Sequence, residues 1–372
     1  MSQDVAPTVL LTVSGSVSDD LQGQVASGQR PRADYVEMAR GFGADLLDYR
    51  AAAREGGVIG RLLRRVGGDN ALLAWACWRR RAAYRLIVTD GEQIGIPLAL
   101  LLKLLGRGAR DTRHAMIVHT LSVPKKQWFF DRLGLQSHVD RFLVYASWQQ
   151  RFITQRWRVA PASVVLTPFM VDDRFFRGDA VTPVPRSPAM ICAVGLERRD
   201  YPTLMDAVRG LPVQVVIAAA SPWSKQADGT ADRSLPDNVR VAKFTQFELR
   251  QLYADAALVV MPLFDVTFQA GVTAILEAMA MERAVICSRT QGQTDVIVDG
   301  ETGVYVPPGD APALRAAIVR LLADTDEAAR LGRAGRHLVE QRLNLDVYVQ
   351  RLTVVVQQLA AETRPVAAQS HV

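Results

Sequence analysis

Short runs of apolar, often β-branched residues alternate with longer amphipathic stretches along the whole chain. This alternation is typical of βαβ units and of parallel sheets, whose strands are apolar on both faces. In the first half the predicted strands are TVLLTV, ADLLDY, RLIVTD, HAMIVH, RFLVYAS and SVVLTP. In the second half they are MICAVG, VQVVIAAA, VRVAKF, ALVVMP, AVICS and GVYVPP. We therefore predict an α/β protein with two doubly wound parallel sheets.

The chain of 372 residues is long enough for two domains. Residues 172–188, DDRFFRGDAVTPVPRSP, contain three prolines and a glycine, which predicts an extended linker. We place an N-terminal domain at 1–180 and a C-terminal domain at 181–345. For 346–372 we expect a helix that crosses back to the first domain, because NLDVYVQRLTVVVQQLAAE has a strongly apolar face, and then a loose tail.

Basic charge is confined to the first half of the chain. Residues 1–178 hold 25 Lys and Arg against 16 Asp and Glu, whereas residues 179–372 hold 19 against 22, within an overall net charge of +6. This asymmetry suggests an anionic partner for the first half, such as phospholipid, an acidic acceptor or nucleic acid, although solubility alone also explains it. No nucleic-acid recognition motif accompanies the charge, so we expect no nucleic-acid partner.

The cysteines and the apolar segments indicate a cytoplasmic protein. Cys77, Cys192 and Cys287 lie far apart in apolar surroundings without a CxxC spacing, which predicts buried free thiols in a reducing compartment. The start, MSQDVAPTVLLTV, lacks the features of a secretory signal, and IGIPLALLLKLLG is too short to span a bilayer.

The segment ALVVMPLFDVTFQAGVTAILEAMA has the features of an anion site. Ligands of open α/β sheets lie beyond the carboxyl ends of the strands, where helix amino termini present free N–H groups. The strand ends near Pro262, and the amides of Gly271, Val272 and Thr273 begin a helix. Glu277 follows inside this apolar helix, where an unpaired acid is costly and a partner is expected. A carboxylate at this place suits a vicinal diol such as a ribose.

These residues resemble a known enzyme family. ILEAMA, AVICS, DVIVDGETGVYVPPGD, ALRAAIVRLLAD and AVGLERRDYPTLMDAV occur in the order and at the spacing of glycosyltransferase family 4, the glycosyl transferases group 1. The resemblance covers residues 188–345. It implies the GT-B fold, in which two Rossmann-like domains face each other across a cleft, and transfer with retention of anomeric configuration.

The resemblance also implies roles for individual residues. The family signature has two glutamates separated by seven residues: Glu277 matches the one that contacts the ribose, whereas Gln269 stands where the other contacts the transferred sugar. Arg198 and Arg199 match the basic pair that neutralises the departing diphosphate. The family usually has a glycine at the position of Glu282, where the helix ends, so the local backbone geometry is in question.

The first domain offers candidates for the acceptor side. His119 resembles a strand-end histidine that the family places near the transferred sugar. Asp90 and Glu92 follow the strand RLIV and are candidates for orienting the acceptor, although Asp90 is equally suited to cap the next helix. Gly15, in the loop VSGSVSD, is a candidate for approaching the diphosphate from the other side.

A basic and aromatic stretch, SVPKKQWFFDRLGL, predicts contact with an anionic membrane surface. Lys125 and Lys126 lie beside Trp128, as in interfacial anchors. The alternative is a helix start whose aromatic side chains pack inward. The runs RLLRR and CWRRRAAYR add to the basic charge of this half. We therefore expect a cytoplasmic protein that is peripheral at the inner membrane face.

The predicted function is retaining transfer of a sugar, expected to be a hexose, from a UDP-, GDP- or ADP-sugar to a glycan, lipid-linked or small-molecule acceptor. We expect no cofactor, because the nucleotide sugar is a co-substrate, and no metal, because no strand-end loop carries a DxD motif. Three alternatives remain: a nucleotide-sugar epimerase or hydrolase on the same fold, a catalytically weak nucleotide-sugar-binding protein, and a membrane-surface adaptor.

Overall fold

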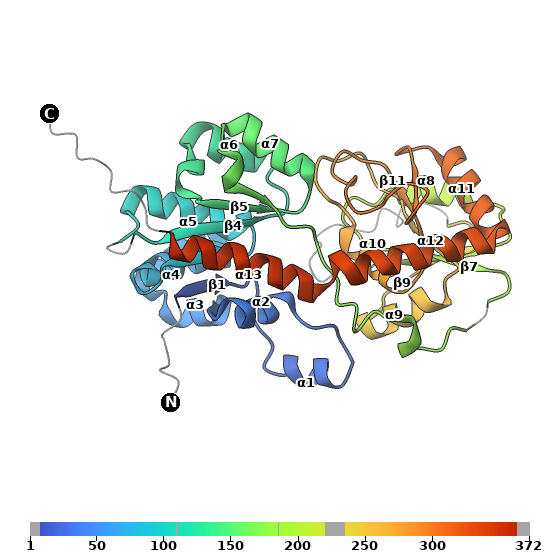
Figure 1. Cartoon of the computed structure of the whole chain (residues 1–372), viewed down its shortest axis with the longest axis horizontal. Coiled ribbons are helices and arrows are strands. Elements are labelled where there is room, and N and C mark those ends of the chain that lie inside the picture. Colours follow the sequence, from blue (N-terminus) through green and yellow to red (C-terminus); the bar gives the residue numbers. More distant parts are fainter. Residues whose placement is uncertain (1–7, 109–110, 185, 220–234, 363–372) are drawn as a thin grey trace.

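The structure is a computed structural model that describes residues 8–108, 111–184, 186–219 and 235–362. It contains two parallel six-stranded sheets, one in each half of the chain (Figure 1). The tail predicted at residues 363–372 lies outside the described residues.

The first sheet has the order β2-β1-β3-β4-β5-β6 and the second has the order β12-β11-β10-β7-β8-β9. The strands of the first are β1 Val9–Thr12, β2 Ala44–Leu47, β3 Leu86–Thr89, β4 Arg113–Val118, β5 Arg141–Val144 and β6 Val164–Leu166. Those of the second are β7 Met190–Val194, β8 Gln214–Ala218, β9 Val239–Ala242, β10 Leu258–Met261, β11 Ala284–Ser288 and β12 Val304–Val306. Every predicted strand is present, and the predicted two-domain α/β class is confirmed.

Helices cover both faces of each sheet. In the first half they are α1 Leu21–Ala26, α2 Asp34–Phe42, α3 Tyr49–Glu55, α4 Gly57–Arg80, α5 Glu92–Leu105, α6 Pro124–Leu133 and α7 Ser147–Trp157. In the second half they are α8 Tyr201–Val208, α9 Gln246–Asp255, α10 Val272–Ala280, α11 Ala311–Ala323, α12 Thr325–Leu338 and α13 Leu345–Ala361. Helices α9 and α10 pack on one face of the second sheet, and α8 and α11 pack on the other.

Helix α13 belongs to the second half by sequence but packs on the first sheet (Figure 1). Its buried side chains join α2 and one face of the strands in a single apolar cluster; they are Leu345, Tyr348, Leu352, Val356 and Leu359. Because parallel strands need both faces covered, α13 supplies part of the cover that the first sheet requires.

The chain crosses between the domains twice, and the two crossings lie side by side. The backbone N–H of Val171 donates to the carbonyl of Leu343 at 3.0 Å, and the N–H of Leu345 donates to the carbonyl of Val171 at 2.9 Å. Phe175 and Phe176, which follow the first crossing, are buried in the core of the second domain. The prediction of an extended linker at residues 172–188 is therefore wrong for the first part of this segment. That part packs against the second domain because it carries these two aromatic side chains.

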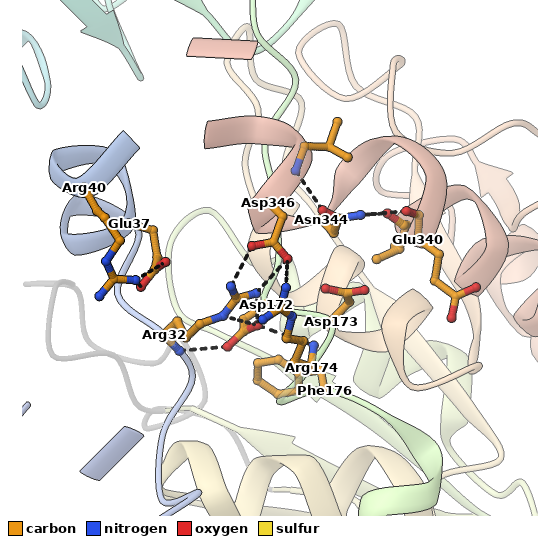
Figure 2. A network of polar contacts seen from close by, with 12 residues as sticks. Arg32, Glu37, Arg40, Asp172, Asp173, Arg174, Phe176, Glu340, Asn344 and Asp346 are labelled. Carbon is orange, nitrogen blue, oxygen red and sulfur yellow. Dashed lines mark hydrogen bonds and ion pairs between the residues drawn. The ribbon is translucent and has the colours of Figure 1, made fainter. Parts of the chain in front are cut away.

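A network of charges fixes the crossing point (Figure 2). Arg32, from the loop between α1 and α2, lies 2.8 Å from Asp172 and 2.7 Å from Asp346 in the first turn of α13. Arg174 approaches the other oxygen of Asp346 at 2.7 Å. The hydrogen bond from Arg32 holds the pKa of Asp346 below its usual range. The network thus ties the first domain to both crossing segments.

Candidate active site

Arg199 is a buried cation in the turn that follows β7. Its Nε donates to the carbonyl of Val194 at 2.8 Å, and its Nη1 donates to the carbonyl of Glu197 at 2.7 Å. The remaining nitrogen, Nη2, lies against Gly195, where a Cβ atom would approach it to 2.5 Å. Burial lowers the pKa of the Arg199 guanidinium. The turn therefore holds a poorly solvated positive charge in one orientation.

Arg198, the other member of the predicted basic pair, has a different environment. Its side chain is exposed, and its backbone has a φ of 56°, a left-handed conformation that is uncommon outside glycine. Its carbonyl accepts a hydrogen bond of 3.1 Å from the N–H of Phe264, which follows β10. The structure therefore separates the pair, and only Arg199 is enclosed.

Gly271 brings the amino terminus of α10 against Arg199. It has a φ of 77°, and a Cβ atom at this position would lie 3.3 Å from Nη1 of Arg199 and 2.8 Å from the sulfur of Met261. No side chain caps α10, so the amides of Val272 and Thr273 keep their free donors. A guanidinium and an uncapped helix amino terminus at one place make an anion site of the kind that binds phosphate.

Glu277 is buried one to two turns further along α10, with 6% of its surface exposed. The partner that the sequence left unidentified is Tyr253 of α9, whose hydroxyl donates to Oε2 of Glu277 at 2.8 Å. Burial raises the pKa of Glu277 to about 7, although the bond from Tyr253 acts in the opposite direction. The buried carboxyl group of Glu277 is therefore a weaker acid than an exposed glutamate.

Two amide side chains in neighbouring loops have acceptor atoms without a donor. Oε1 of Gln269 and Oε1 of Gln293 are buried and have no hydrogen-bond partner among the described residues. Gln293 is fully buried, and its Nε2 donates to the carbonyl of Ala270 at 2.8 Å, next to Gln269. Unsatisfied buried acceptors are costly, so these two oxygens need donors that the described residues do not supply. The sequence predicted Gln269 but not Gln293.

His119 lies at the end of β4 beside carboxylates. Its Nε2 is 3.8 Å from Oδ1 of Asp90, and its ring centre is 5.2 Å from that of Tyr145. Burial acts to lower the pKa of His119, but the contact with Asp90 and the charge of Glu92 outweigh it and raise the pKa. Burial and the negative charge of Asp90 raise the pKa of Asp34, at the start of α2, to about 6.

Glu92 is fully buried and is already engaged by several donors. It accepts hydrogen bonds from the backbone N–H groups of His119, at 3.0 Å, and Thr120, and it forms an ion pair of 3.1 Å with Lys126. These contacts fix the loop that carries His119. Helix α5 begins with Gly91 as its N-cap and has no side-chain cap, so Asp90 does not have the capping role considered above.

The backbone of Gly15 is also engaged. Its N–H donates to the carbonyl of Val13 at 2.8 Å, and its carbonyl accepts from the N–H of Tyr49 at 3.0 Å. The predicted approach of this loop to a diphosphate stays a prediction, and it would need a donor other than the Gly15 amide.

Loops of the two candidate half-sites touch across the domain interface. The hydroxyl of Thr267 donates to that of Ser122 at 3.1 Å, which joins the loop of Gln269 to the loop of His119. Ser147, at the start of α7, contacts Asp295 in the loop that follows β11. The fold therefore brings predicted residues from both halves of the chain to one interface.

Of the residues predicted to contact a membrane, some are exposed and others are bound or buried within the protein. Lys125 is exposed and Trp128 is half-exposed, whereas Lys126 is bound to Glu92 and Phe130 is buried. Within the described residues, no helix is long and apolar enough to cross a bilayer. The three cysteines are buried and free, as predicted. The described parts of the chain contain no group of three or more His, Cys, Asp or Glu side chains that could hold a metal ion.

Comparison with known proteins places the candidate anion site in a recognised region. Residues 196–324 match the family model described as glycosyl transferases group 1. The chain is also 28% identical over 153 residues to the alpha-D-kanosaminyltransferase of Streptomyces kanamyceticus. That match covers 41% of this chain and 39% of the relative, so the chain spans about two fifths of the length of the curated relative it matches.

Solved structures match nearly the whole fold. A glycosyltransferase from Rickettsia africae has a TM-score of 0.68 at 16% identity, covering 95% of this chain and 99% of its own. Anabaena Alr3699/HepE, solved with UDP and glucose, has a TM-score of 0.63 at 13% identity, covering 95% and 100%. At these identities the likeness shows the fold. The predicted GT-B architecture is confirmed.

Proposed function

We propose that the protein transfers a sugar from a nucleotide diphosphate sugar to an acceptor hydroxyl, with retention of anomeric configuration. The observation that carries this proposal is the closeness of the buried Arg199 guanidinium to Gly271 at the uncapped start of α10, which leaves little room for a Cβ atom. Glu277 lies further along the same helix, and all three residues fall within the span that matches glycosyl transferases group 1.

The proposed reaction needs preorganised positive charge more than it needs a nucleophile. When the bond between the sugar C1 and the phosphate oxygen breaks, negative charge develops on the diphosphate, and Arg199 and the amides of Val272 and Thr273 stabilise it. The acceptor oxygen then bonds to C1 on the face that the diphosphate leaves. The acceptor proton passes to the released diphosphate, so atoms and charge balance without a covalent enzyme intermediate.

Glu277 binds the ribose in this proposal. Its Oε2 is oriented by Tyr253, which leaves Oε1 to accept from a ribose hydroxyl. Gln269 holds the transferred sugar, because its side chain is partly exposed and its amide oxygen accepts from a sugar hydroxyl without adding a second charge. The two functions are therefore separate: the carboxylate fixes the nucleotide, and the amide of Gln269 selects the sugar.

The acceptor approaches from the first domain. His119 and Asp90 lie together at the strand ends there. These groups orient the attacking hydroxyl. Independence from metal ions and the choice among UDP-, GDP- and ADP-sugars are further parts of the proposal.

A thermal-shift screen against UDP-, GDP- and ADP-sugars tests donor binding, because a ligand that binds the folded form raises its melting temperature. One donor should stabilise the wild type but not Arg199→Ala or Glu277→Ala. Arg320→Ala, which removes a half-exposed arginine from α11, is the matched control and should respond as the wild type does. Equal stabilisation of all variants would contradict the proposed site.

Product analysis with and without an acceptor separates the enzymatic alternatives. Transfer predicts a glycosylated product that requires the acceptor and forms in the presence of a chelator. Release of free sugar without acceptor would indicate a hydrolase, and an isomerised nucleotide sugar would indicate an epimerase. Tight donor binding without any turnover would indicate a binding protein.

A further inference from the structure

The first half of α4 exposes a stripe of apolar side chains. Val58, Ile59, Leu62 and Val66 have 74%, 54%, 60% and 84% of their surface exposed. Their spacing, with offsets of one, four and eight residues from Val58, places them on one side of an α-helix. Single exposed apolar residues are common, but such a row on one helix marks a binding surface.

Positive charge borders this stripe. Arg61 and Arg65 are exposed and, at helical spacing, lie along one edge of the apolar row. Arg64 is paired with Asp69 at 2.6 Å. No acidic residue occurs between Glu55 and Asp69. The surface is therefore apolar along its centre and basic along its edge.

The segment is anchored on its opposite side. Gly60 is buried, and a Cβ atom there would lie 2.8 Å from Leu72 and 3.2 Å from Trp75, so the two halves of α4 are in close contact. The indole nitrogen of Trp75 also donates to the carbonyl of Gly56 at 3.2 Å. Gly68 has a φ of 70° and lets the chain turn back between the halves. The apolar stripe consequently points away from the domain.

The location suits contact with a large flat partner. Helix α4 lies at the end of the first domain that is farther from the second domain (Figure 1). A partner bound there would leave the interface between the domains open to substrates. The first half of the chain also carries the excess of basic residues, which attracts an anionic surface over a longer range.

We propose that residues 57–67 form an interfacial helix that binds an anionic phospholipid bilayer. The side chains of Val58, Leu62 and Val66 enter between the headgroups, and Arg61 and Arg65 contact lipid phosphates. A second copy of the chain fits this surface poorly, because a two-fold contact would bring the arginines of both copies together without an acid to pair them. The proposal goes beyond the proposed function and does not depend on donor binding.

The test is co-sedimentation of the full chain with vesicles. The wild type should bind vesicles of equimolar phosphatidylglycerol and phosphatidylcholine and should bind phosphatidylcholine alone much more weakly. The double variant Arg61→Gln/Arg65→Gln should lower the partition coefficient roughly thirtyfold, from about 1 kcal/mol for each arginine near the surface. Leu62→Ser/Val66→Ser should also lower it, and rising salt should weaken wild-type binding.

Val319→Ser/Arg320→Gln is the matched control, because it removes an exposed apolar and basic pair from α11 of the second domain. It should bind as the wild type does. The proposal is overturned if the wild type binds neither vesicle, if the α4 variants retain wild-type binding, or if only the control variant loses it. Unchanged melting temperatures of the α4 variants would show that a loss of binding is not a loss of folding.

Discussion

Asp295 of the second domain accepts two hydrogen bonds from Ser147 of the first, one from the backbone N–H at 2.7 Å and one from the hydroxyl at 2.8 Å. Ser147 is the first residue of α7, whose N-cap, Ala146, has no side-chain hydroxyl or carboxylate. The helix amino terminus of one domain is thus capped by a carboxylate from the other, which is favourable for both the free N–H groups and the helix dipole.

Asp295→Ala should loosen the contact between the domains. The loss of this exposed, charge-assisted pair of hydrogen bonds should weaken the contact between the domains by about 1 kcal/mol. Small-angle X-ray scattering should show a larger radius of gyration, and the KM for the donor should rise. Asp299→Ala is the control, because the contacts of Asp299 with Arg289 and Tyr305 stay within the second domain. A radius of gyration for Asp295→Ala equal to that of the wild type would contradict this prediction.

Tyr253→Phe should move the pH dependence of nucleotide binding. The ribose hydroxyls donate to the ionised form of Glu277, whose pKa is about 7, so affinity should increase as the pH rises through 7. The hydrogen bond from Tyr253 lowers that pKa, and its loss should shift the binding curve to higher pH. Titration calorimetry with UDP across this range measures the shift. Tyr348→Phe, which removes a buried hydroxyl from α13, should leave the curve in place.

Gln269→Glu should alter sugar preference more than nucleotide affinity. The substitution keeps the size of the side chain and adds a negative charge beside Gln293. The order of affinity for sugars with differently placed hydroxyl groups should therefore change, while Glu277 still holds the ribose. Competition between nucleotide sugars measures the preference, and the Kd for the free nucleotide measures the affinity. Identical selectivity in the two proteins would mean that Gln269 does not face the sugar.

Glu282→Gly should stabilise the protein by about 1 kcal/mol, because Glu282 is exposed and has a φ of 57°, a conformation that costs a side chain with a Cβ atom about this much. Chemical denaturation measures the change. Glu282→Ala retains the Cβ atom and should show no comparable gain. A destabilised glycine variant would indicate that the glutamate side chain makes a compensating contact.

His114 should make the fold sensitive to acid. The residue is fully buried, and burial lowers its pKa to about 4. Below pH 6.5 the unfolded chain binds a proton that the folded protein excludes. The free energy of unfolding is therefore highest above pH 6.5 and falls as the pH decreases toward 4, by at most about 3 kcal/mol. Urea unfolding at several pH values should show a flatter dependence for His114→Gln. His337→Gln is the control, because His337 lies on α12 of the second domain.

Most strands were predictable because they are continuous apolar runs with both faces buried, as VLLT of β1 shows, whereas the edge strands β2 and β9 are less buried. The exposed apolar row in the first half of α4 was not predicted, because its exposure depends on how Gly60 packs against Leu72 and Trp75. A periodic pattern shows that a helix has an apolar side, but it does not show whether another element covers that side.

Within the candidate site, the sequence identified Glu277 and Arg199 but not what fixes them. Tyr253 lies on a different helix, and its contact with Glu277 depends on how α9 and α10 pack. Asp295 likewise meets Ser147 only after the two domains have come together. Such contacts between distant segments leave no local signal, whereas a helix start or a strand end does.

The return of α13 to the first sheet has a consequence for biosynthesis. During translation the strands β1 to β6 are made long before Leu352 and Val356, which cover part of one of their faces. The first domain therefore cannot complete its core until α13 has left the ribosome. Until then the apolar face that α13 covers stays exposed and is accessible to chaperones. Deleting this helix should leave the second domain folded while the first aggregates.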